Sequence, residues 1–383
     1  MHILHITTFL QGGAGRIILN LALNQIKSGH QVSVITSKTS EPGYCNYSEY
    51  IDEFKNNGIE LIEIDSTFKR DLYLNFNVVT YLQMLLRRSP IDIIHAHAAI
   101  PALIGIIARS GSLSAIPIIQ TMHGWGLNKN AEQEKMDIAI MQGLDKVVTA
   151  SNNDKNFLEM KGINSERLVT IYNGIDSPQM DDDPESLNGP ENAILLSDLK
   201  KFKEQGLHII GCIGTVCERK NQSLLLEAFH RLSNNARCMC LFIGEGELIP
   251  LLQSKALAYG LEDRVKFYGY QKNASRYINR FDCLVLPSIS EGLGLTIIEA
   301  FRNRVPVIVS DIPVFKEVVE NRKSGFIFES NNANSLTVQL SEFLSSSKEV
   351  LKLYGENGYR TYLRLFTIKT MIENYKELYS YFL

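Results

Sequence analysis

The residues best suited to chemistry are two glutamates, Glu291 and Glu299, in the stretch SISEGLGLTIIEAF. Apolar runs on either side, at 281–287 and 305–309, predict buried parallel strands, so the stretch between them is a glycine-bearing loop that opens a helix. Such a loop presents backbone N–H groups and the positive end of a helix dipole, which suit a phosphate. Because carboxylates repel a phosphate, we assign the glutamates to hydroxyl groups. A nucleotide sugar, which carries both, satisfies the whole loop.

The string PSxxEGxGLxxxEA around these glutamates resembles the E-x7-E signature of the retaining GT-B glycosyltransferases, the family of glycogen synthase and of the bacterial group 1 enzymes that build lipid-linked and capsular glycans. The resemblance covers essentially the whole chain. It implies that Glu291 contacts the transferred sugar and that Glu299 contacts the ribose of the nucleotide. The loop between them is expected to bind the donor through Gly292, Leu293, Gly294 and Leu295.

Two cations, Arg219 and Lys220, precede a helix in the stretch TVCERKNQSLLLEAF. The resemblance places Lys220 on the donor diphosphate, together with an Arg directly after the strand glycine. Thr215 stands at that position here, and we expect Arg219 to supply the missing charge. The leaving diphosphate gains negative charge as the glycosidic bond breaks, and cations and helix N-termini can neutralise it. The alternative is an exposed, solvated Lys-Arg pair.

We therefore expect neither a cofactor nor an essential metal. Asp181 and Asp183 form a D-x-D pattern, which binds a divalent cation in metal-dependent GT-A transferases. The pattern lies in a polar, acidic stretch instead of following a strand, and we interpret it as a solvated charge run. His95 and His97 alternate along a predicted strand, so we expect them to face opposite sides of the sheet and not to share a metal. One of them is expected to be structural.

The first half offers one more catalytic candidate, His123, at the strand end TMHGWG; the resemblance places this histidine close to the reacting sugar. Glycines in the GGAGR connection at 12–16 allow close approach to a charged group, and the resemblance directs this connection to the donor diphosphate. The spacing is not G-x-G-x-x-G, and no acidic residue ends the second strand, which disfavours a dinucleotide-binding fold. Many relatives carry Glu in place of Gly15. The donor-binding candidates of this connection are Gly12, Gly13 and Gly15.

Three strand ends in the second half add donor-binding candidates. The resemblance implies that the last of these turns, GYQKN, lines the pocket for the base. Nothing in it selects one base, although we favour a UDP-sugar. Arg304 replaces the usual Gly before the strand at 305–309. These further candidates are Gly214, Gly244, Tyr270 and Gln271.

The elements that position these residues alternate between short apolar runs and helical patterns, which predicts α/β architecture with doubly wound sheets. The resemblance implies a GT-B fold: two facing Rossmann-like domains with a cleft between them. We expect an acceptor-side domain at 1–177, a linker at 178–207, a nucleotide-sugar-binding domain at 208–358 and a C-terminal helix at 359–383 that crosses back to the first domain. The predicted strands are 2–9, 31–37, 60–65, 91–96, 116–122, 146–150, 168–172, 208–214, 240–243, 265–268, 281–287, 305–309 and 324–328.

Composition limits the partners. A chain of 383 residues, 45% apolar and 21% charged, can form two hydrophobic cores, and its net charge of −3 gives no general attraction for nucleic acid. We expect no secretion signal and no membrane-spanning segment, and the six cysteines form no C-x-x-C pair, which favours reduced thiols and a cytoplasmic protein. Basic and aromatic residues near the C-terminus leave peripheral contact with the inner face of a membrane open.

The expected reaction is retaining transfer of a hexose-type sugar from a nucleotide-diphosphate sugar to a hydroxyl of a sugar, lipid-linked or small-molecule acceptor, in bacterial glycan or glycoconjugate biosynthesis. We assign no protein nucleophile. Two alternatives stand beside it: a nucleotide-sugar 2-epimerase of the same fold, and a non-catalytic sugar-nucleotide-binding module, which the departures at Thr215 and Arg304 suggest. The sugar, the base, the acceptor and the oligomeric state stay open.

Overall fold

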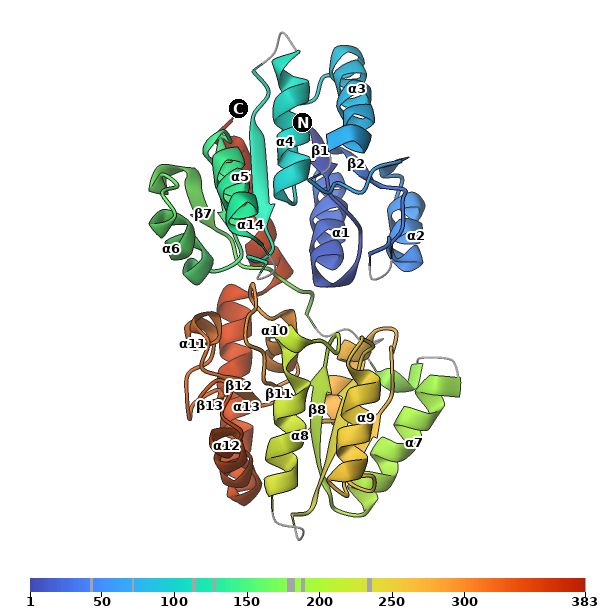
Figure 1. Cartoon of the computed structure of the whole chain (residues 1–383), viewed down its shortest axis with the longest axis vertical. Helices are drawn as coiled ribbons and strands as arrows, with labels where there is room; N and C mark the ends of the chain where they lie inside the picture. The colour runs from blue at the N-terminus through green and yellow to red at the C-terminus, as the bar shows by residue number, and fades with distance from the viewer. Residues whose placement is uncertain are drawn as a thin grey trace. The chain divides into compact units, whose positions relative to one another are not determined.

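The computed structural model describes residues 1–41, 44–70, 72–111, 115–126, 129–177, 183–186, 190–232 and 236–382. The chain forms two compact units (Figure 1). The first comprises Met1–Gly174 and Ile368–Leu383, and the second comprises Ile175–Thr367. Each unit is a parallel sheet flanked by helices, and none of the helices described has the length and apolar character needed to span a bilayer.

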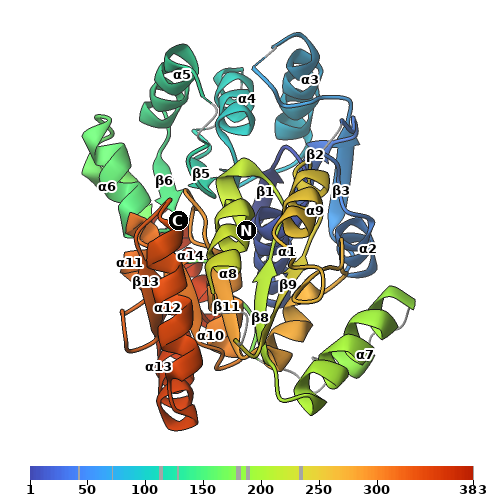
Figure 2. The same ribbon diagram turned by 60° about the horizontal axis from the view of Figure 1, so that its bottom comes forward.

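Among the described residues, the sheet of the first unit has seven parallel strands in the order β3-β2-β1-β4-β5-β6-β7. Figure 2 labels β3, β2, β1, β5 and β6, which follow one another in this order across the view. The inner strands of this sheet are continuous apolar runs buried on both faces, the pattern of a parallel sheet covered by helices. The strands are β1 (His2–Ile6), β2 (Gln31–Ser37), β3 (Glu60–Ile64), β4 (Ile93–Ala96), β5 (Ile118–Met122), β6 (Lys146–Thr149) and β7 (Leu168–Thr170). The helices are α1 (Gly12–Lys27), α2 (Ser48–Asn56), α3 (Leu72–Arg88), α4 (Ala99–Ser110), α5 (Ala131–Gln142), α6 (Asn152–Met160) and α14 (Ile368–Ser380).

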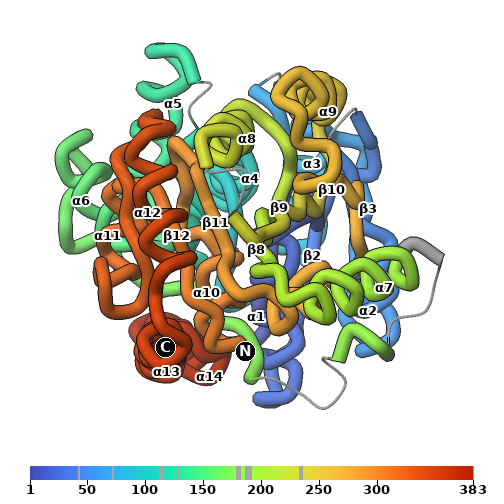
Figure 3. Tube along the Cα trace, turned by 90° about the horizontal axis from the view of Figure 1, so that it is seen from below, coloured from blue at the N-terminus to red at the C-terminus, as the bar shows by residue number. Residues whose placement is uncertain are grey.

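The described part of the second unit contains a sheet of six parallel strands in the order β10-β9-β8-β11-β12-β13. Figure 3 labels β10, β9, β8, β11 and β12, which follow one another in this order from right to left. The strands are β8 (His208–Ile213), β9 (Cys238–Ile243), β10 (Val265–Phe267), β11 (Cys283–Leu286), β12 (Val307–Ser310) and β13 (Gly325–Phe328). The helices are α7 (Pro190–Glu204), α8 (Gln222–Arg231), α9 (Ile249–Ala258), α10 (Leu295–Arg302), α11 (Pro313–Val318), α12 (Ala333–Ser345) and α13 (Lys348–Leu365). All thirteen strands expected from the sequence form, with ends displaced by at most a few residues.

In each sheet the strand order reverses beside the first strand of the unit. β1 pairs with β2 on one side and with β4 on the other, and β8 pairs with β9 and β11 in the same way. Open α/β sheets bind ligands beyond the carboxyl ends of the strands at such reversals. The connections after β1, β8 and β11 carry most of the site candidates named from the sequence.

The segment at 178–207, expected as a linker, is in large part a packed helix. Helix α7 belongs to the second unit, where Leu195, Leu199 and Phe202 are buried. Their i, i+4, i+7 spacing places them on one face of the helix. The sequence analysis missed this apolar stripe because the segment begins with acidic residues and prolines, which are typical of a linker.

The C-terminal stretch, expected as a single helix over 359–383, is two helices assigned to different units. α13 ends at Leu365 in the second unit, and α14 begins at Ile368 in the first. Between them the buried Phe366 accepts a hydrogen bond from Ile175 N at 3.0 Å, and Thr367 pairs with Ile175 as an isolated parallel bridge. The backbone of Phe366 and Thr367 thus pairs with the segment at Ile175, and α13 does not continue into α14.

Candidate functional site

Glu291 is the centre of the candidate site in the second unit, in the loop that follows β11. Its side chain is only 7% exposed, yet it is surrounded by polar partners. Lys220 Nζ lies 2.5 Å from Oε1, Arg219 Nη1 lies 3.0 Å from Oε2, and Ser288 Oγ donates to Oε1 at 2.8 Å. The structure therefore brings together the three residues of this unit that we named as catalytic.

The two loops that carry these residues are also joined through their backbones. Arg219 Nη1 donates to Ser290 O at 2.8 Å, and Ile289 N donates to Arg219 O at 2.9 Å. The first loop is the short 3-10 turn Glu218–Lys220 after β8, and the second follows β11, its neighbour in the sheet. Adjacent parallel strands therefore place the cations beside the carboxylate.

The electrostatics of the cluster favour an anionic ligand. Burial alone would raise the pKa of the Glu291 carboxyl, but the charges of Lys220 and Arg219 hold that pKa below its ordinary value. Glu291 is therefore ionised at neutral pH, and the trio carries one net positive charge. The single negative charge of the carboxylate neutralises one of the two cations. The remaining positive charge can bind a phosphate.

Glycines allow the neighbouring strand ends to approach the cluster. A Cβ on Gly244, whose φ is +139°, would lie 2.1 Å from Gly214 O, so no side chain fits there. A Cβ on Gly214 would lie 3.9 Å from Lys220 Nζ. Gly214 therefore lies beside the lysine head group, and Gly244 packs against Gly214, at the carboxyl ends of β8 and β9.

Helix α10 begins directly after the Glu291 loop. Gly294 precedes it with φ +79°, and a Cβ there would lie 2.9 Å from the ring of Phe315. Leu293 is buried, while Gly292 and Leu295 are partly exposed. Glu299 lies inside this helix. The loop thus has the strand-loop-helix form that the sequence predicts.

The base-pocket candidates follow β10. Tyr270 is 45% exposed, whereas Gln271 is buried and donates Nε2 to Tyr268 O at 2.8 Å. Tyr268 in turn donates its hydroxyl to Asp198 of α7 at 2.8 Å. The Gln271 amide nitrogen is therefore committed to the turn itself.

The two departures from the family pattern have structural accounts. Arg304 adopts φ +56°, a conformation that favours glycine, and its guanidinium lies 3.7 Å from the ring centre of Tyr359 and 2.9 Å from Glu356, both on α13. These contacts compensate for the backbone strain. The second cation beside Glu291 is Arg219, whereas the family pattern places an Arg at the position that Thr215 occupies here.

In the first unit, the glycines at 12–16 begin α1 and do not form a separate loop. Gly12 and Gly13 are exposed at the start of this helix, and Gly12 has φ +55°. Gly15 is buried, and a Cβ there would lie 2.8 Å from Leu10 C and 2.9 Å from the Tyr50 ring. This crowding explains why the chain has glycine where many relatives carry Glu.

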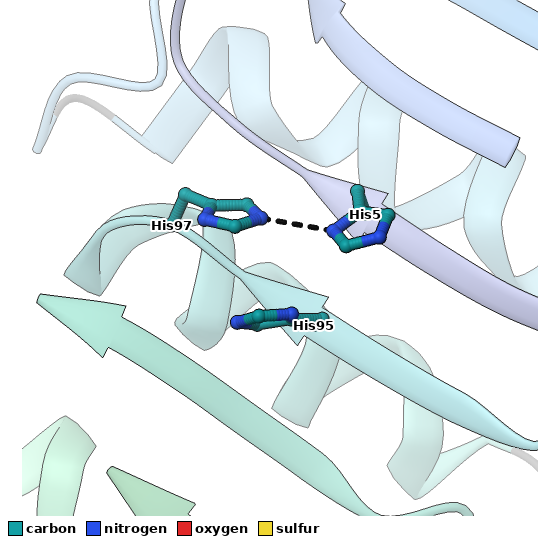
Figure 4. A group of neighbouring side chains, drawn as sticks. All are labelled: His5, His95 and His97. Carbon is teal, nitrogen blue, oxygen red and sulfur yellow. Dashed lines mark hydrogen bonds between the residues drawn. The ribbon is translucent and has the colours of Figure 1, made fainter. Parts of the chain in front are cut away.

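His95 and His97 do not face opposite sides of the sheet, so that expectation is wrong. Residues two apart in a strand share a face, and their ring centres lie 4.4 Å apart. His5 of β1, paired in register with His95, completes a buried cluster (Figure 4). The sequence analysis did not single out His5, although the in-register pairing of β1 with β4 places it there.

The cluster is one end of a hydrogen-bonded chain that reaches His123. Gln25 Oε1 lies 2.8 Å from His5 Nε2, His5 Nδ1 lies 2.9 Å from His97 Nε2 (Figure 4), and His97 Nδ1 lies 3.1 Å from His123 Nε2. A carbonyl oxygen only accepts, so His5 donates from Nε2 and accepts at Nδ1. The same logic makes His97 and then His123 donate from Nε2. His123 Nδ1, at the far end of the hydrogen-bonded chain from Gln25, therefore carries no proton.

Two observations support this direction. The Gln25 amide nitrogen is engaged with Tyr379 OH at 3.1 Å, which leaves Oε1 for His5. His123 Nδ1 is buried and has no hydrogen-bond partner among the described residues, and a buried lone pair without a partner is less costly than a buried N–H. Burial lowers the pKa of His5 and of His123 to about 4, so both rings are neutral at physiological pH.

The cluster does not fit a metal in this arrangement. Ligand nitrogens of His5, His95 and His97 lie within 4.8 Å of one another, close enough in principle for a shared ion. All six ring nitrogens are instead hydrogen-bonded, those of His95 to Tyr379 OH and Thr121 Oγ1, both at 2.7 Å. A metal ligand needs a bare nitrogen. Of the D-x-D pattern, Asp181 lies outside the described residues, and Asp183 pairs with Arg280 at 3.1 Å.

Two family models match the chain. Residues 11–178 match the model described as Glycosyltransferase Family 4, and residues 197–361 match the one described as Glycosyl transferases group 1. Together they cover the two units except for their ends and the join.

Curated relatives are similar over most of their length. N-acetyl-alpha-D-glucosaminyl L-malate synthase of Bacillus anthracis is 24% identical over 382 residues, which cover 96% of this chain and 93% of the relative. UDP-Gal:alpha-D-GlcNAc-diphosphoundecaprenol alpha-1,3-galactosyltransferase of Escherichia coli is 24% identical over 314 residues, covering 78% and 77%.

Among solved structures, Anabaena Alr3699/HepE in complex with UDP and glucose matches with a TM-score of 0.80 at 18% identity, over 99% of each chain. At this identity the likeness concerns the fold. With the two parallel sheets, it confirms the α/β two-domain GT-B architecture.

Proposed function

Because the chain belongs to the group 1 glycosyltransferases, we propose that it transfers a hexose-type sugar from a UDP-sugar to an acceptor hydroxyl with retention of configuration. The observation that carries this proposal is the cluster of Glu291, Lys220 and Arg219, a buried carboxylate beside two cations at the strand reversal of the second unit. Its net positive charge suits a diphosphate, and its carboxylate suits a sugar hydroxyl.

We assign the roles as follows. Lys220 and Arg219 stabilise the leaving diphosphate, whose oxygens compete with Glu291 for the same hydrogen-bond donors. Glu291, partly released by that competition, contacts the transferred sugar, and Glu299 contacts the ribose. A donor phosphate oxygen takes the proton of the acceptor hydroxyl. In the first unit, His123 contacts the reacting sugar through a tautomer that the histidine chain maintains.

The relatives support the setting in which we place this reaction. The Escherichia coli relative is named for UDP-Gal and for a lipid-linked acceptor, and the Anabaena structure contains UDP. We infer that the protein acts in bacterial glycan or glycoconjugate biosynthesis on a sugar, lipid-linked or small-molecule acceptor. We place it in the cytoplasm or at the inner face of the membrane, without an essential metal or cofactor.

The test is incubation of the full chain with a panel of UDP-, GDP- and ADP-sugars, followed by mass spectrometry for the released nucleotide and free sugar. We expect slow hydrolysis of a UDP-sugar and its loss in Lys220→Ala. Conversion of the donor to its 2-epimer, without release of nucleotide, would favour the epimerase. Tight UDP binding with no turnover in the presence of any acceptor would favour the non-catalytic module.

A further inference from the structure

The first unit contains a pocket of about 290 Å³, and His123 is the one residue of its wall to which we assigned a role above. It lies beyond the carboxyl ends of β1, β4 and β5, where Thr8, His97 and His123 line it. Arg70, from the segment after β3, and Asp137, on α5, form another part of its wall. The pocket is large enough for a group the size of about ten water molecules.

The charges of the pocket are arranged around Asp137. This carboxylate is 2% exposed, and Arg70 Nη2 lies 2.7 Å from each of its oxygens. Lys129 Nζ lies 2.8 Å from Oδ2. Two cations on one buried carboxylate leave one net positive charge, and the histidines of the wall add none because burial lowers their pKa values.

Lys129 is held in place and is not a solvated surface lysine. Its ammonium lies 3.5 Å from the centre of the Trp125 ring, and its side chain is mostly buried. A cation fixed between an aromatic face and a carboxylate loses little conformational freedom when it binds an anion. The geometry of the pocket is therefore preorganised for a negatively charged group.

Polar atoms in the wall also lack partners. Gln120 is 1% exposed, and its Oε1 makes no hydrogen bond to the described residues; the same holds for Arg70 Nε and His123 Nδ1. Buried polar atoms are nearly always satisfied in native proteins, so three such atoms around one pocket require an explanation. A ligand with hydroxyl groups would satisfy the acceptor atoms, and an anionic group would satisfy the guanidinium.

We propose that this pocket binds the acceptor substrate through one anionic group, a carboxylate or phosphate held by Arg70 and Lys129, and through hydroxyl groups that donate to Gln120. The proposal deepens the proposed function and rests on it for the identity of the ligand as the acceptor. The binding chemistry itself depends only on the pocket. The acceptor is therefore an acidic polyol, such as a uronic acid or a phosphorylated sugar.

The experiment is calorimetric titration of the full chain with three matched probes: D-glucuronate, D-glucose 6-phosphate and D-glucose. We expect the preferred anionic probe to bind at least tenfold more tightly than neutral glucose, and the comparison of the two anions shows whether carboxylate or phosphate is the ligand group. Equal affinity for all three probes, or no measurable binding of either anion, would overturn the proposal.

Two variants locate the binding. Lys129→Gln should reduce the preference for the anion about tenfold. Lys161→Gln is the matched control, because Lys161 also pairs with a carboxylate, Glu134 at 2.9 Å, and lies over an aromatic ring, Phe157 at 5.3 Å, but is not part of the pocket wall. An equal effect of both variants would overturn the assignment to this pocket.

Asp137→Asn provides a change of opposite sign. It raises the net charge of the pocket from one to two and should tighten anion binding, provided that circular dichroism shows the variant to be folded. If it does not fold, the Lys129→Gln comparison decides alone. Donor hydrolysis is measured on the same samples: hydrolysis without anion preference contradicts only the pocket, and anion preference without hydrolysis contradicts the proposed function.

Discussion

At the scale of single residues, the two glutamates of the stretch after β11 differ in environment. Glu291 lies in a loop, nearly buried and paired with Lys220 and Arg219, whereas Glu299 lies within the helix that follows. Under the proposed function, the carboxylate beside the two cations contacts the reacting centre. The carboxylate farther along the helix contacts the part of the donor that does not change.

Replacement of each glutamate should therefore affect different kinetic constants. Glu299→Gln should raise the donor KM and weaken UDP binding more than it lowers kcat, because a ribose contact contributes equally in the ground and transition states. Glu291→Gln should lower kcat while UDP affinity stays within a few-fold. Calorimetric UDP binding and initial rates for both variants provide the measurement. If Glu291→Gln loses UDP binding and Glu299→Gln loses turnover instead, the donor lies in the reverse orientation.

The second prediction at this scale concerns acid stability. Burial lowers the pKa of His5 from 6.5 to about 4, so the unfolded chain takes up a proton before the folded chain does. The stability that comes from keeping this ring neutral is fully present above pH 6.5 and is lost as the pH falls toward 4. The free energy of unfolding decreases by roughly 3 kcal/mol over this range.

Urea unfolding followed by the fluorescence of Trp125, the one tryptophan of the chain, reports on the first unit. We expect His5→Asn to lose less stability than the wild type between neutral pH and about pH 4, whatever its stability at neutral pH. His230→Asn, which removes an exposed imidazole of the second unit, is the control. A wild-type pH dependence unchanged in His5→Asn would contradict the buried neutral ring.

At the scale of elements, α14 is tied to the sheet of the first unit by buried hydroxyl groups. Tyr379 OH accepts from Gln25 Nε2 at 3.1 Å and lies 2.7 Å from His95 Nδ1, and Tyr375 OH lies 2.9 Å from Thr121 Oγ1. These bonds join the last helix of the chain to the histidine chain at the carboxyl edge of the sheet. The C-terminal helix thus supports residues far from it in sequence.

Tyr379→Phe should consequently destabilise the first unit by about 1–3 kcal/mol, because it leaves buried polar partners unsatisfied without creating a cavity. Tyr381→Phe, at an exposed position two residues later, should change stability by less than about 0.5 kcal/mol. The same tryptophan-monitored unfolding measures both. Equal stabilities of the two variants would show that the Tyr379 hydroxyl contributes nothing to holding α14.

At the scale of the whole molecule, catalysis is expected to proceed without a metal ion. We propose that Lys220 and Arg219, which pair with Glu291, take the place of the divalent cation of D-x-D transferases; Asp183 is engaged with Arg280. Sugar transfer or donor hydrolysis should therefore survive excess EDTA. Abolition by EDTA and restoration by manganese would contradict this prediction.

The sequence by itself determined the α/β architecture, because parallel strands buried on both faces appear as continuous apolar runs that need no tertiary information to recognise. The two-domain GT-B arrangement was inferred from the family resemblance. It also determined the strand-loop-helix around Glu291, where glycines and the helix pattern are local signals. The pairing of Glu291 with Lys220 and Arg219 was open to inference only through the family resemblance, since 71 and 72 residues separate the partners.

Only the tertiary structure decided which side chains from distant strands meet. The register between β1 and β4 brings His5 to His95 and His97, a contact between strands that the pattern of one strand cannot reveal. Arg70, Lys129 and Asp137 carried no motif at all. Their meeting depends on where α5 and the segment after β3 pack, and packing is a property of the assembled core and not of any local stretch of sequence.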